Sequence, residues 1–507
     1  MIKKKFGYFI FLCLTAFLAI LPQLYVSYSI KQSKFLLLLF LLLVIFGLIG
    51  RVIFVISIFL LDITSIFIVH TYLHWGGYDG NIEPRLAVAY ISPSYETFEY
   101  LQTYINIYDL SILIYLFISF VITLFIFRFH IKIPLVVKGI AIVLAILIIG
   151  KIKHREPVKI IDELINVIHR NQLTIDRVEQ QEKQHDVSIA DRTKKKVYDD
   201  IVIIFGESVN RGFLSLYGYH KETTPFMNAI RENLNYLNAI APTNQTELSM
   251  PIYLVNARLD HFNKDYVYNP SLIKTYNDAG YRTLWLSNQG SAGKHDDKIR
   301  AIAQESNSTT FFNEGKEYYA AKTDNVFLNY FQTHPLSDIK SVYFLHLIGS
   351  HFDYKKRYTE NIALNPNTKG IVEEYENSIY YTDQVLERIF KYFMVRNKKV
   401  LIIYLSDHGE VVSEQKHGHG FVPSYKNEYE VPFIIYSSIP NKRLQKIKDH
   451  YSNTPLNLEN FKNYVEYLSY MRDDINISNR SNVISLTPDN VIDYTKLKRI
   501  GCDEKIY

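Results

Sequence analysis

A single stretch of sequence decides the fold: Leu401-Ile402-Ile403-Tyr404-Leu405-Ser406-Asp407-His408-Gly409-Glu410. An unbroken apolar run ends abruptly in a carboxylate, an imidazole and a glycine, which is typical of a buried parallel strand that presents polar groups at its carboxyl edge. Ligands bind at that edge in open α/β sheets. Asp407 and His408 offer an oxygen and a nitrogen that suit Zn²⁺. An ordinary strand end with a capping aspartate explains this peptide equally well, so other segments must decide.

Strand and helix patterns alternate from Val197 onward, which predicts a mainly parallel sheet covered by helices. Apolar runs at 200–205, 281–286 and 341–347 resemble the run at 401–405, and a further strand is expected at 431–436. The first three are followed by polar or small residues, namely Gly206-Glu207-Ser208, Ser287-Asn288-Gln289 and Gly349-Ser350-His351. These groups should meet at one edge of the sheet.

Glu207, Asp407 and His408 can therefore converge on one ion, and a catalytic zinc site needs three protein ligands and an open position. The group that would do chemistry is sought in residues 238–251, a turn-rich segment leading into a helix. A hydroxyl at the start of that helix lies near the positive end of its dipole. On spacing alone, however, an ordinary N-cap is the favoured role for Thr246 or Ser249.

Residues 1–150 predict a membrane domain with five transmembrane helices. The apolar stretches are 7–28, 35–50, 52–72, 110–128 and 133–150, and each approaches the ~20 residues that cross a hydrocarbon core. The distribution of Lys and Arg among the loops places the amino terminus in the cytoplasm and everything after residue 150 outside it. Residues 151–196 are interpreted as an interfacial amphipathic helix and a polar linker, and residues 197–507 as the soluble catalytic domain.

Charge and cysteine content exclude two other classes of protein. The net charge of +5 is modest, and the basic residues are scattered, so no nucleic-acid partner is expected. The two cysteines are Cys13, inside the first apolar stretch, and Cys502, near the carboxyl end. They cannot plausibly meet, so no disulfide framework is expected.

Several motifs in order resemble those of the bacterial phosphoethanolamine transferases, membrane enzymes of the alkaline phosphatase and sulfatase superfamily. The matching residues are Gly206-Glu207-Ser208, Tyr217-Gly218-Tyr219, Thr223-Thr224-Pro225-Phe226, Thr246-x-x-Ser249-x-Pro251, Ser287-Asn288-Gln289, Gly349-Ser350-His351 and Ser406-Asp407-His408-Gly409-Glu410. The resemblance covers the whole soluble half and implies an α/β/α fold like that of alkaline phosphatase, attached to a five-helix membrane domain.

The resemblance also implies roles for individual residues. Glu207, Thr246, Asp407 and His408 would hold the catalytic zinc, and Thr246 would be the nucleophile that becomes phosphorylated. His351 and a histidine of 417–420 would contact the phosphate or a second zinc. His419 fits that role best and His417 remains open. The residues expected near the phosphate or the acceptor are Asn288, Gln289 and Lys294. The expected cofactor is Zn²⁺, as one ion or two, in preference to Mn²⁺.

The implied reaction is zinc-dependent transfer of phosphoethanolamine from phosphatidylethanolamine through a phosphothreonine intermediate. The acceptor would be a core sugar of lipopolysaccharide or lipooligosaccharide, lipid A, or another periplasmic glycan. Family members that modify lipid A carry cysteines that bracket the nucleophile, and the comparable positions near Pro242 and Ile252 lack them. That departure favours the cysteine-poor branch. The resemblance further implies a multi-pass protein of a bacterial inner membrane with a periplasmic catalytic domain.

Two alternatives remain open at this point. A phosphoglycerol transferase has a similar domain arrangement and also uses a metal ion to activate its nucleophile, but its donor is phosphatidylglycerol and its metal is often manganese. A catalytically inactive, metal-binding membrane module belongs to a different class. A true sulfatase is disfavoured, because no Cys/Ser-x-Pro-x-Arg arrangement occurs at the nucleophile.

Overall fold

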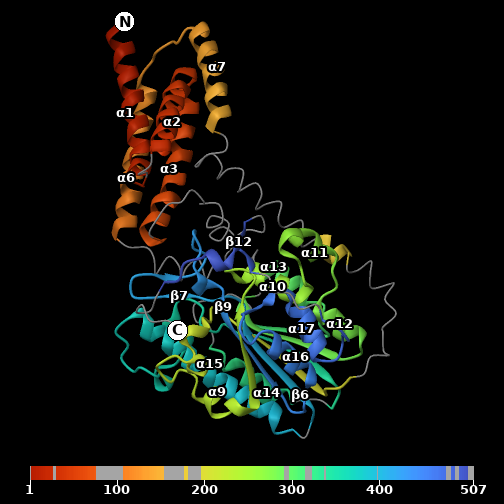
Figure 1. Ribbon diagram of the computed structural model, residues 1–507. Coiled ribbons are helices and arrows are strands. Elements are labelled where there is room, and N and C mark those ends of the chain that lie inside the picture. Colours follow the sequence, from red (N-terminus) through yellow and green to blue (C-terminus); the bar gives the residue numbers. More distant parts are fainter. Residues whose placement is uncertain are drawn as a thin grey trace. The chain divides into compact units, whose positions relative to one another are not determined.

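The structure is a computed structural model that describes residues 2–26, 30–75, 107–152, 176–180, 196–290, 296–313, 323–335, 338–396, 398–475, 481–485 and 490–500. Its contacts divide the chain into two compact units (Figure 1). The helical unit comprises Met1–Tyr90 and Glu96–His169, and the α/β unit comprises Ile91–Tyr95 and Arg170–Tyr507.

The helical unit contains a helix at each of the apolar stretches. They are α1 (Ile2–Val26), α2 (Ile30–Ile49), α3 (Arg51–Trp75), α6 (Ile107–Leu124) and α7 (Leu135–Ile152). Small and apolar side chains such as Leu12, Ala16 and Phe54 are buried where these helices pack together. Within the described residues, each of the five predicted stretches therefore contains a helix over most of its length.

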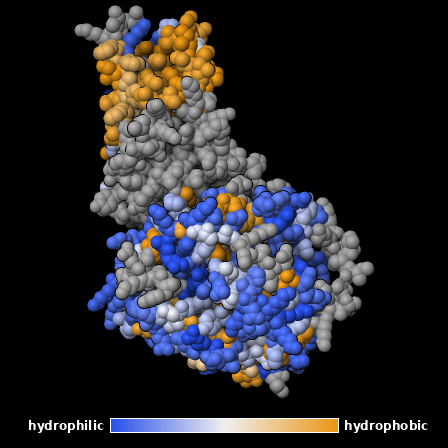
Figure 2. Space-filling model, viewed as in Figure 1, coloured by the Kyte–Doolittle hydropathy of each residue, from blue (hydrophilic) through white to orange (hydrophobic). Residues whose placement is uncertain are grey.

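The outward surface of these helices is strongly apolar. Leu135 is 84% exposed and Phe117 is 68% exposed, and Figure 2 shows this surface as a nearly continuous hydrophobic area. In the described part of the chain, one helical segment, Leu110–Arg128, is long and apolar enough to cross a membrane, and Lys5–Leu21, Leu36–Ile49 and Leu135–Ile149 are shorter apolar segments. The helices therefore lie where the sequence predicted them, but five membrane crossings are not confirmed.

The α/β unit is built on an eight-stranded sheet with the order β10-β2-β9-β6-β1-β5-β3-β4. Its strands are β1 (Asp200–Gly206), β2 (Leu234–Ile240), β3 (Arg282–Gly290), β4 (Ser308–Asn313), β5 (Ser341–His346), β6 (Val400–Ser406), β9 (Glu430–Ser437) and β10 (Leu456–Asn457). β9 pairs antiparallel with both β6 and β2, and the other pairs are parallel. Two short ladders, β7 (Val411–Val412) with β8 (His417–Gly418) and β11 (Asn482–Ile484) with β12 (Val491–Asp493), lie outside this sheet.

Helices cover both faces of the sheet, because each central strand is apolar on both faces. In β1, Ile201, Ile203 and Phe205 face one core, whereas Val202 and Ile204 face the other. The first core is closed by α10 (Thr246–Val255), α11 (Phe262–Tyr268), α12 (Leu272–Asp278), α13 (Asp296–Ala303), α16 (Lys442–His450) and α17 (Phe461–Leu468). The second is closed by α9 (Pro225–Ala229), α14 (Val326–Thr333) and α15 (Ile371–Met394).

Four of the predicted strands are confirmed as β1, β3, β5 and β6. The fifth is confirmed as β9, but it runs antiparallel to its neighbours. Three strands of the same sheet, β2, β4 and β10, were not predicted. Of the predicted interfacial helix and linker, residues 153–175 and 181–195 lie outside the described residues, and 176–180 are helical.

Candidate metal centre

Two neighbouring parallel strands deliver the central residues of the site. β1 pairs with β6 in a register that sets Gly206 opposite Ser406. The residues that follow, Glu207 and Asp407, therefore emerge side by side at the carboxyl edge of the sheet. Thr246 reaches the same edge as the first residue of α10. Three segments far apart in the sequence thus meet at one point.

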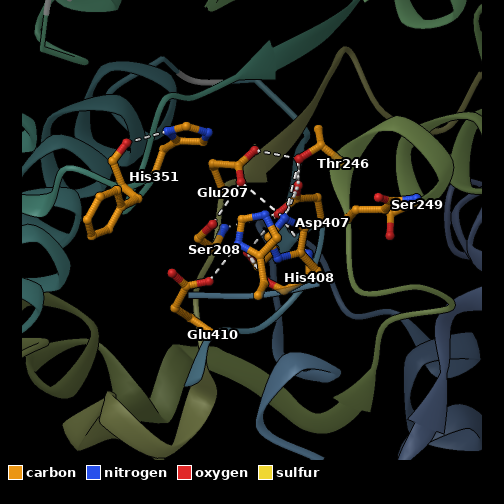
Figure 3. Close-up of polar contacts among 12 residues, drawn as sticks. Glu207, Ser208, Thr246, Ser249, His351, Asp407, His408 and Glu410 are labelled. Atoms are coloured by element: carbon orange, nitrogen blue, oxygen red, sulfur yellow. Dashed lines mark hydrogen bonds and ion pairs between the residues drawn. The ribbon is translucent and has the colours of Figure 1, made fainter. Parts of the chain in front are cut away.

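The four side chains lie within hydrogen-bond distance of one another (Figure 3). The Oγ1 atom of Thr246 lies 2.6 Å from Asp407 Oδ2, 3.0 Å from Glu207 Oε2 and 3.3 Å from His408 Nε2. His408 Nε2 lies 3.2 Å from Glu207 Oε1 and 3.4 Å from Asp407 Oδ2. A single hydroxyl proton cannot serve all three neighbours of Thr246.

Backbone and side-chain contacts fix which atoms face this point. The backbone N–H groups of Ser208 and His408 donate to Asp407 Oδ1 at 3.1 and 2.7 Å, which leaves Oδ2 directed at Thr246. His408 Nδ1 donates to the Gly409 carbonyl oxygen at 2.8 Å, so the lone pair of the neutral ring lies on Nε2. The Ser208 hydroxyl donates to Glu207 Oε1 at 2.8 Å.

The charges of the buried groups are strongly interdependent. Burial and the adjacent Glu207 carboxylate raise the pKa of Asp407 to about 7. Burial works against the charge of His408, but Asp407 and Glu207 outweigh it and raise the pKa of His408 to about 10. Burial likewise opposes ionisation of Glu207, yet the bond to His408 holds its pKa well below the usual range. Two buried carboxylates this close require a compensating positive charge.

The donor set fits a zinc ion. The ligand atoms of Glu207, Asp407 and His408 lie within 4.8 Å of one another and all three residues are buried. Two carboxylate oxygens and one imidazole nitrogen are ordinary zinc ligands, and the hydrogen bond at His408 Nδ1 is the usual outer contact of a metal-binding histidine. The Thr246 hydroxyl lies where a fourth ligand would be needed.

A second group of ligand atoms adjoins the first. His408, Glu410 and His419 also lie within 4.8 Å of one another, and His419 Nδ1 is 2.8 Å from Glu410 Oε2. The rings of His408 and His419 are 4.1 Å apart. The role of Glu410 was not anticipated from the sequence, although it stands in the same motif, directly after Gly409.

The other predicted histidines differ in their positions. His417 does not join this group, and its ring stacks on Phe352 at 5.4 Å. His351 lies beside Glu207 (Figure 3), with its Nδ1 atom 2.6 Å from the Phe352 carbonyl oxygen. Of the two histidines left open at 417–420, the structure brings His419 to the centre.

Of the residues expected near the phosphate, one borders the metal-ligand set and another lies away from it. Gln289 Nε2 donates to Glu207 Oε2 at 3.2 Å and to the Leu347 carbonyl at 2.9 Å, so Gln289 borders the centre. Asn288 instead donates to Asp324 at 2.9 Å, and Asp324 in turn accepts the backbone N–H groups of Ile348 and Gly349. Asn288 therefore supports the loop after β5. Lys294 lies outside the described residues.

The expectation that Thr246 or Ser249 caps the helix is wrong. The N-cap of α10 is Gln245, whose side chain makes no capping hydrogen bond, and Thr246 is the first helical residue. Ser249 is buried and its hydroxyl lies 3.0 Å from that of Thr243, so it points away from the centre in Figure 3. The Thr246 hydroxyl therefore stands beside the metal-ligand set and does not cap the helix.

Residues 199–459 match the sulfatase family. The chain belongs to that family. This sulfatase-family chain is 28% identical to a phosphoethanolamine transferase, EptC, from Escherichia coli K12 over 263 residues, which are 47% of this chain and 45% of that one. It is 31% identical to a putative phosphoethanolamine transferase of Haemophilus influenzae over 255 residues, which are 46% of this chain and 52% of that one. The matches span about half the length of these curated relatives.

Solved structures agree in fold. The C-terminal periplasmic domain of Escherichia coli EptC, in a complex with Zn, matches with a TM-score of 0.52 at 23% identity and covers 59% of this chain and 93% of that one. The integral membrane protein lipooligosaccharide phosphoethanolamine transferase A from Neisseria meningitidis matches with a TM-score of 0.64 at 17% identity. This second match covers 92% of the sulfatase-family chain and 95% of the other, so the likeness in fold extends through the helical unit.

Proposed function

We propose that this protein is a zinc-dependent phosphoethanolamine transferase that takes its group from phosphatidylethanolamine through a phosphothreonine at residue 246. One observation carries the proposal: the Thr246 hydroxyl lies within 3.3 Å of ligand atoms from Glu207, Asp407 and His408. The names of the curated relatives support the choice of phosphoethanolamine. The apolar surface of the helices supports a donor drawn from the bilayer.

Glu207, Asp407, His408 and Thr246 would hold the zinc. A bound zinc ion lowers the pKa of a coordinated hydroxyl and offsets the negative charge of a phosphodiester. Thr246 Oγ1 attacks phosphorus in line, and the bond from phosphorus to the diacylglycerol oxygen breaks. The proton of Thr246 leaves along its 2.6 Å hydrogen bond to Asp407 Oδ2.

His419 serves the leaving and entering groups. His419 Nδ1 donates to Glu410 Oε2 at 2.8 Å, and burial lowers the pKa of His419, so its Nε2 atom starts without a proton. Nε2 would relay the proton released by Thr246 to the departing diacylglycerol oxygen, and in the second step it would take the proton of the acceptor hydroxyl and return it toward Thr246. Gln289 keeps Glu207 oriented through the cycle. In the second step the acceptor oxygen attacks the phosphothreonine, and Thr246 regains its proton.

The acceptor is proposed as an envelope glycan, in the first instance a core sugar of lipopolysaccharide or lipooligosaccharide. The sequence around Thr246 has no cysteine from Pro242 to Ile252, in contrast to the lipid A-modifying members of the family that this chain resembles. Mass spectrometry of envelope glycans from cells with and without the gene identifies the acceptor.

Intact mass and peptide mapping of the full chain test the reaction after incubation with head-group-labelled phosphatidylethanolamine in micelles. We expect one phosphoethanolamine adduct on Thr246, which is lost in Thr246→Ala and kept in Ser249→Ala, a matched control on the same helix. An adduct from phosphatidylglycerol alone would identify a phosphoglycerol transferase. A zinc-loaded protein that forms no adduct with either lipid would be an inactive metal-binding module.

A further inference from the structure

The helix α13 contacts the nucleophile helix α10 near its start, and the chain just beyond its end contacts Arg177 of the helical residues 176–180. Near its start lies Lys298, a lysine that is only 5% exposed. Lys298 Nζ donates to Glu247 Oε1 at 2.6 Å, and Glu247 directly follows Thr246. A buried lysine is uncommon unless it is paired, so this contact ties α13 to the first turn of α10.

The first turn of α10 begins at Thr246, directly after an N-cap residue without a capping side-chain bond. The Gln245 side chain does not cap the helix, although an N-cap side chain normally satisfies one of the free N–H groups there. Glu247 lies in the first turn of α10, where its negative charge interacts favourably with the helix dipole, and it directly follows Thr246 in the sequence. Lys298 neutralises the Glu247 carboxylate and fixes the direction in which it points.

The other end of α13 is held by Arg177, from the helical residues 176–180. Arg177 is 1% exposed, and its guanidinium donates to Glu305 Oε1 at 2.7 Å, two residues beyond α13. It also donates to the carbonyl oxygens of Tyr266 and Asn269. Tyr266 in turn donates its hydroxyl to the carbonyl oxygen of Lys298 at 3.2 Å, so the two cations share a neighbour.

We propose that Lys298 and Arg177, at the two ends of α13, are positioning residues that hold the Thr246 hydroxyl at the metal-ligand set. The proposal deepens the proposed transferase function and rests on it for its effect on rate. Arg177 belongs to the α/β unit, so both supports of α13 lie within the unit that carries the metal-ligand set.

An ordinary structural ion pair is the competing explanation, and buried ion pairs are weak evidence of stabilisation by themselves. The chain offers a matched control for it. Lys462 in α17 is also buried and pairs with Glu466 at 3.2 Å, and neither residue adjoins a proposed metal ligand in the sequence. Lys298→Met and Lys462→Met therefore remove the same group from comparable surroundings.

The variants are compared with the wild-type full chain by hydrogen exchange and by transfer activity. Hydrogen exchange of the zinc-free protein reports on residues 245–252 without any need for activity, and we expect Lys298→Met to speed exchange there about tenfold while Lys462→Met leaves it unchanged. In the transfer assay we expect Lys298→Met to lower kcat about tenfold to a hundredfold at an unchanged KM, because small displacements of a nucleophile are costly. Arg177→Met should act in the same direction on both readouts.

Rescue variants separate positioning from folding. Lys298→Arg should restore most of the exchange protection, and the swapped pair Glu247→Lys with Lys298→Glu should restore more than either single change. Exchange in Lys298→Met equal to that in Lys462→Met would overturn the role of Lys298, and wild-type exchange in Arg177→Met would overturn that of Arg177. If the wild-type protein transfers no phosphoethanolamine, the proposed function fails, and the exchange result still decides this inference.

Discussion

Gly349 allows the loop after β5 to approach the metal centre, and its substitution tests the geometry of the site. Its φ is +49°, and a Cβ atom there would lie 2.8 Å from the Glu207 nitrogen and 2.9 Å from the Glu207 carbonyl oxygen. Both neighbours are backbone atoms of a proposed metal ligand, so they cannot rotate away. Gly349→Ala must therefore move the Glu207 peptide.

The expected cost has two parts. An alanine in the left-handed region costs roughly 1–2 kcal/mol, and forced overlap in a packed region costs about 1–3 kcal/mol more. We expect the free energy of unfolding to fall by about 2–5 kcal/mol. Displacing Glu207 by a few tenths of an ångström exceeds the tolerance of a metal–ligand distance, so zinc affinity should fall about tenfold to a hundredfold.

Zinc titration against a chromophoric chelator and thermal melting measure the two effects. The control is Gly370→Ala, where the new Cβ would meet the Glu414 carboxylate, the movable tip of a side chain, and φ is −161°. We expect the control to keep wild-type zinc affinity. Wild-type affinity in Gly349→Ala would show that Glu207 is not held where the structure places it, or does not bind the metal.

Two further predictions concern pH and metal removal. Burial raises the pKa of Asp200 to about 6. A carboxyl whose pKa is higher in the folded state than in the unfolded state stabilises the fold while it is protonated. The contribution of Asp200 to the free energy of unfolding is therefore complete below about pH 4 and is lost as the pH rises through about 6. Thermal unfolding at pH 4.5 and at pH 7 measures this effect. Between these two pH values the free energy of unfolding of the wild type should fall by up to about 3 kcal/mol more than that of Asp200→Asn. Equal losses in the two proteins would contradict the raised pKa of Asp200. Chelation of zinc should lower the melting temperature by about 5 °C or more, because Glu207 and Asp407 are left facing each other with only His408 as a counter-charge. Zinc should restore the melting temperature and magnesium should not, and a melting curve indifferent to chelation would argue against a metal at this point.

The fold could be predicted to the extent that local patterns express it. Runs such as 200–205 and 401–405 are apolar on both faces, and only a strand buried between two layers of helices needs that pattern. β2 was missed because its burial alternates irregularly, with Asn235, Tyr236 and Asn238 among its apolar residues. The direction of β9 could not be predicted, because an apolar run has the same pattern in a parallel and in an antiparallel buried strand.

The candidate site was likewise predictable only where a local sequence pattern marks its residues. Glu207, Asp407 and His408 could be found because each directly follows an apolar strand, and the carboxyl ends of parallel strands share one edge. Glu410 lies in the same motif, but its role could not be predicted from it. Its partner His419 is nine residues further along the chain, and the antiparallel pairing of β7 with β8 brings the two together. The contact between Lys298 and Glu247 joins positions that no local pattern relates.

By itself, then, the sequence determined which strands are buried and which polar groups end them, because both follow from hydrophobicity within a few residues. Only the tertiary structure decided that Thr246 begins a helix beside those groups, that His419 approaches them and His417 does not, and that Asn288 turns to Asp324. Such choices depend on the register of strands and the packing of helices. Interactions between residues far apart in the chain set both.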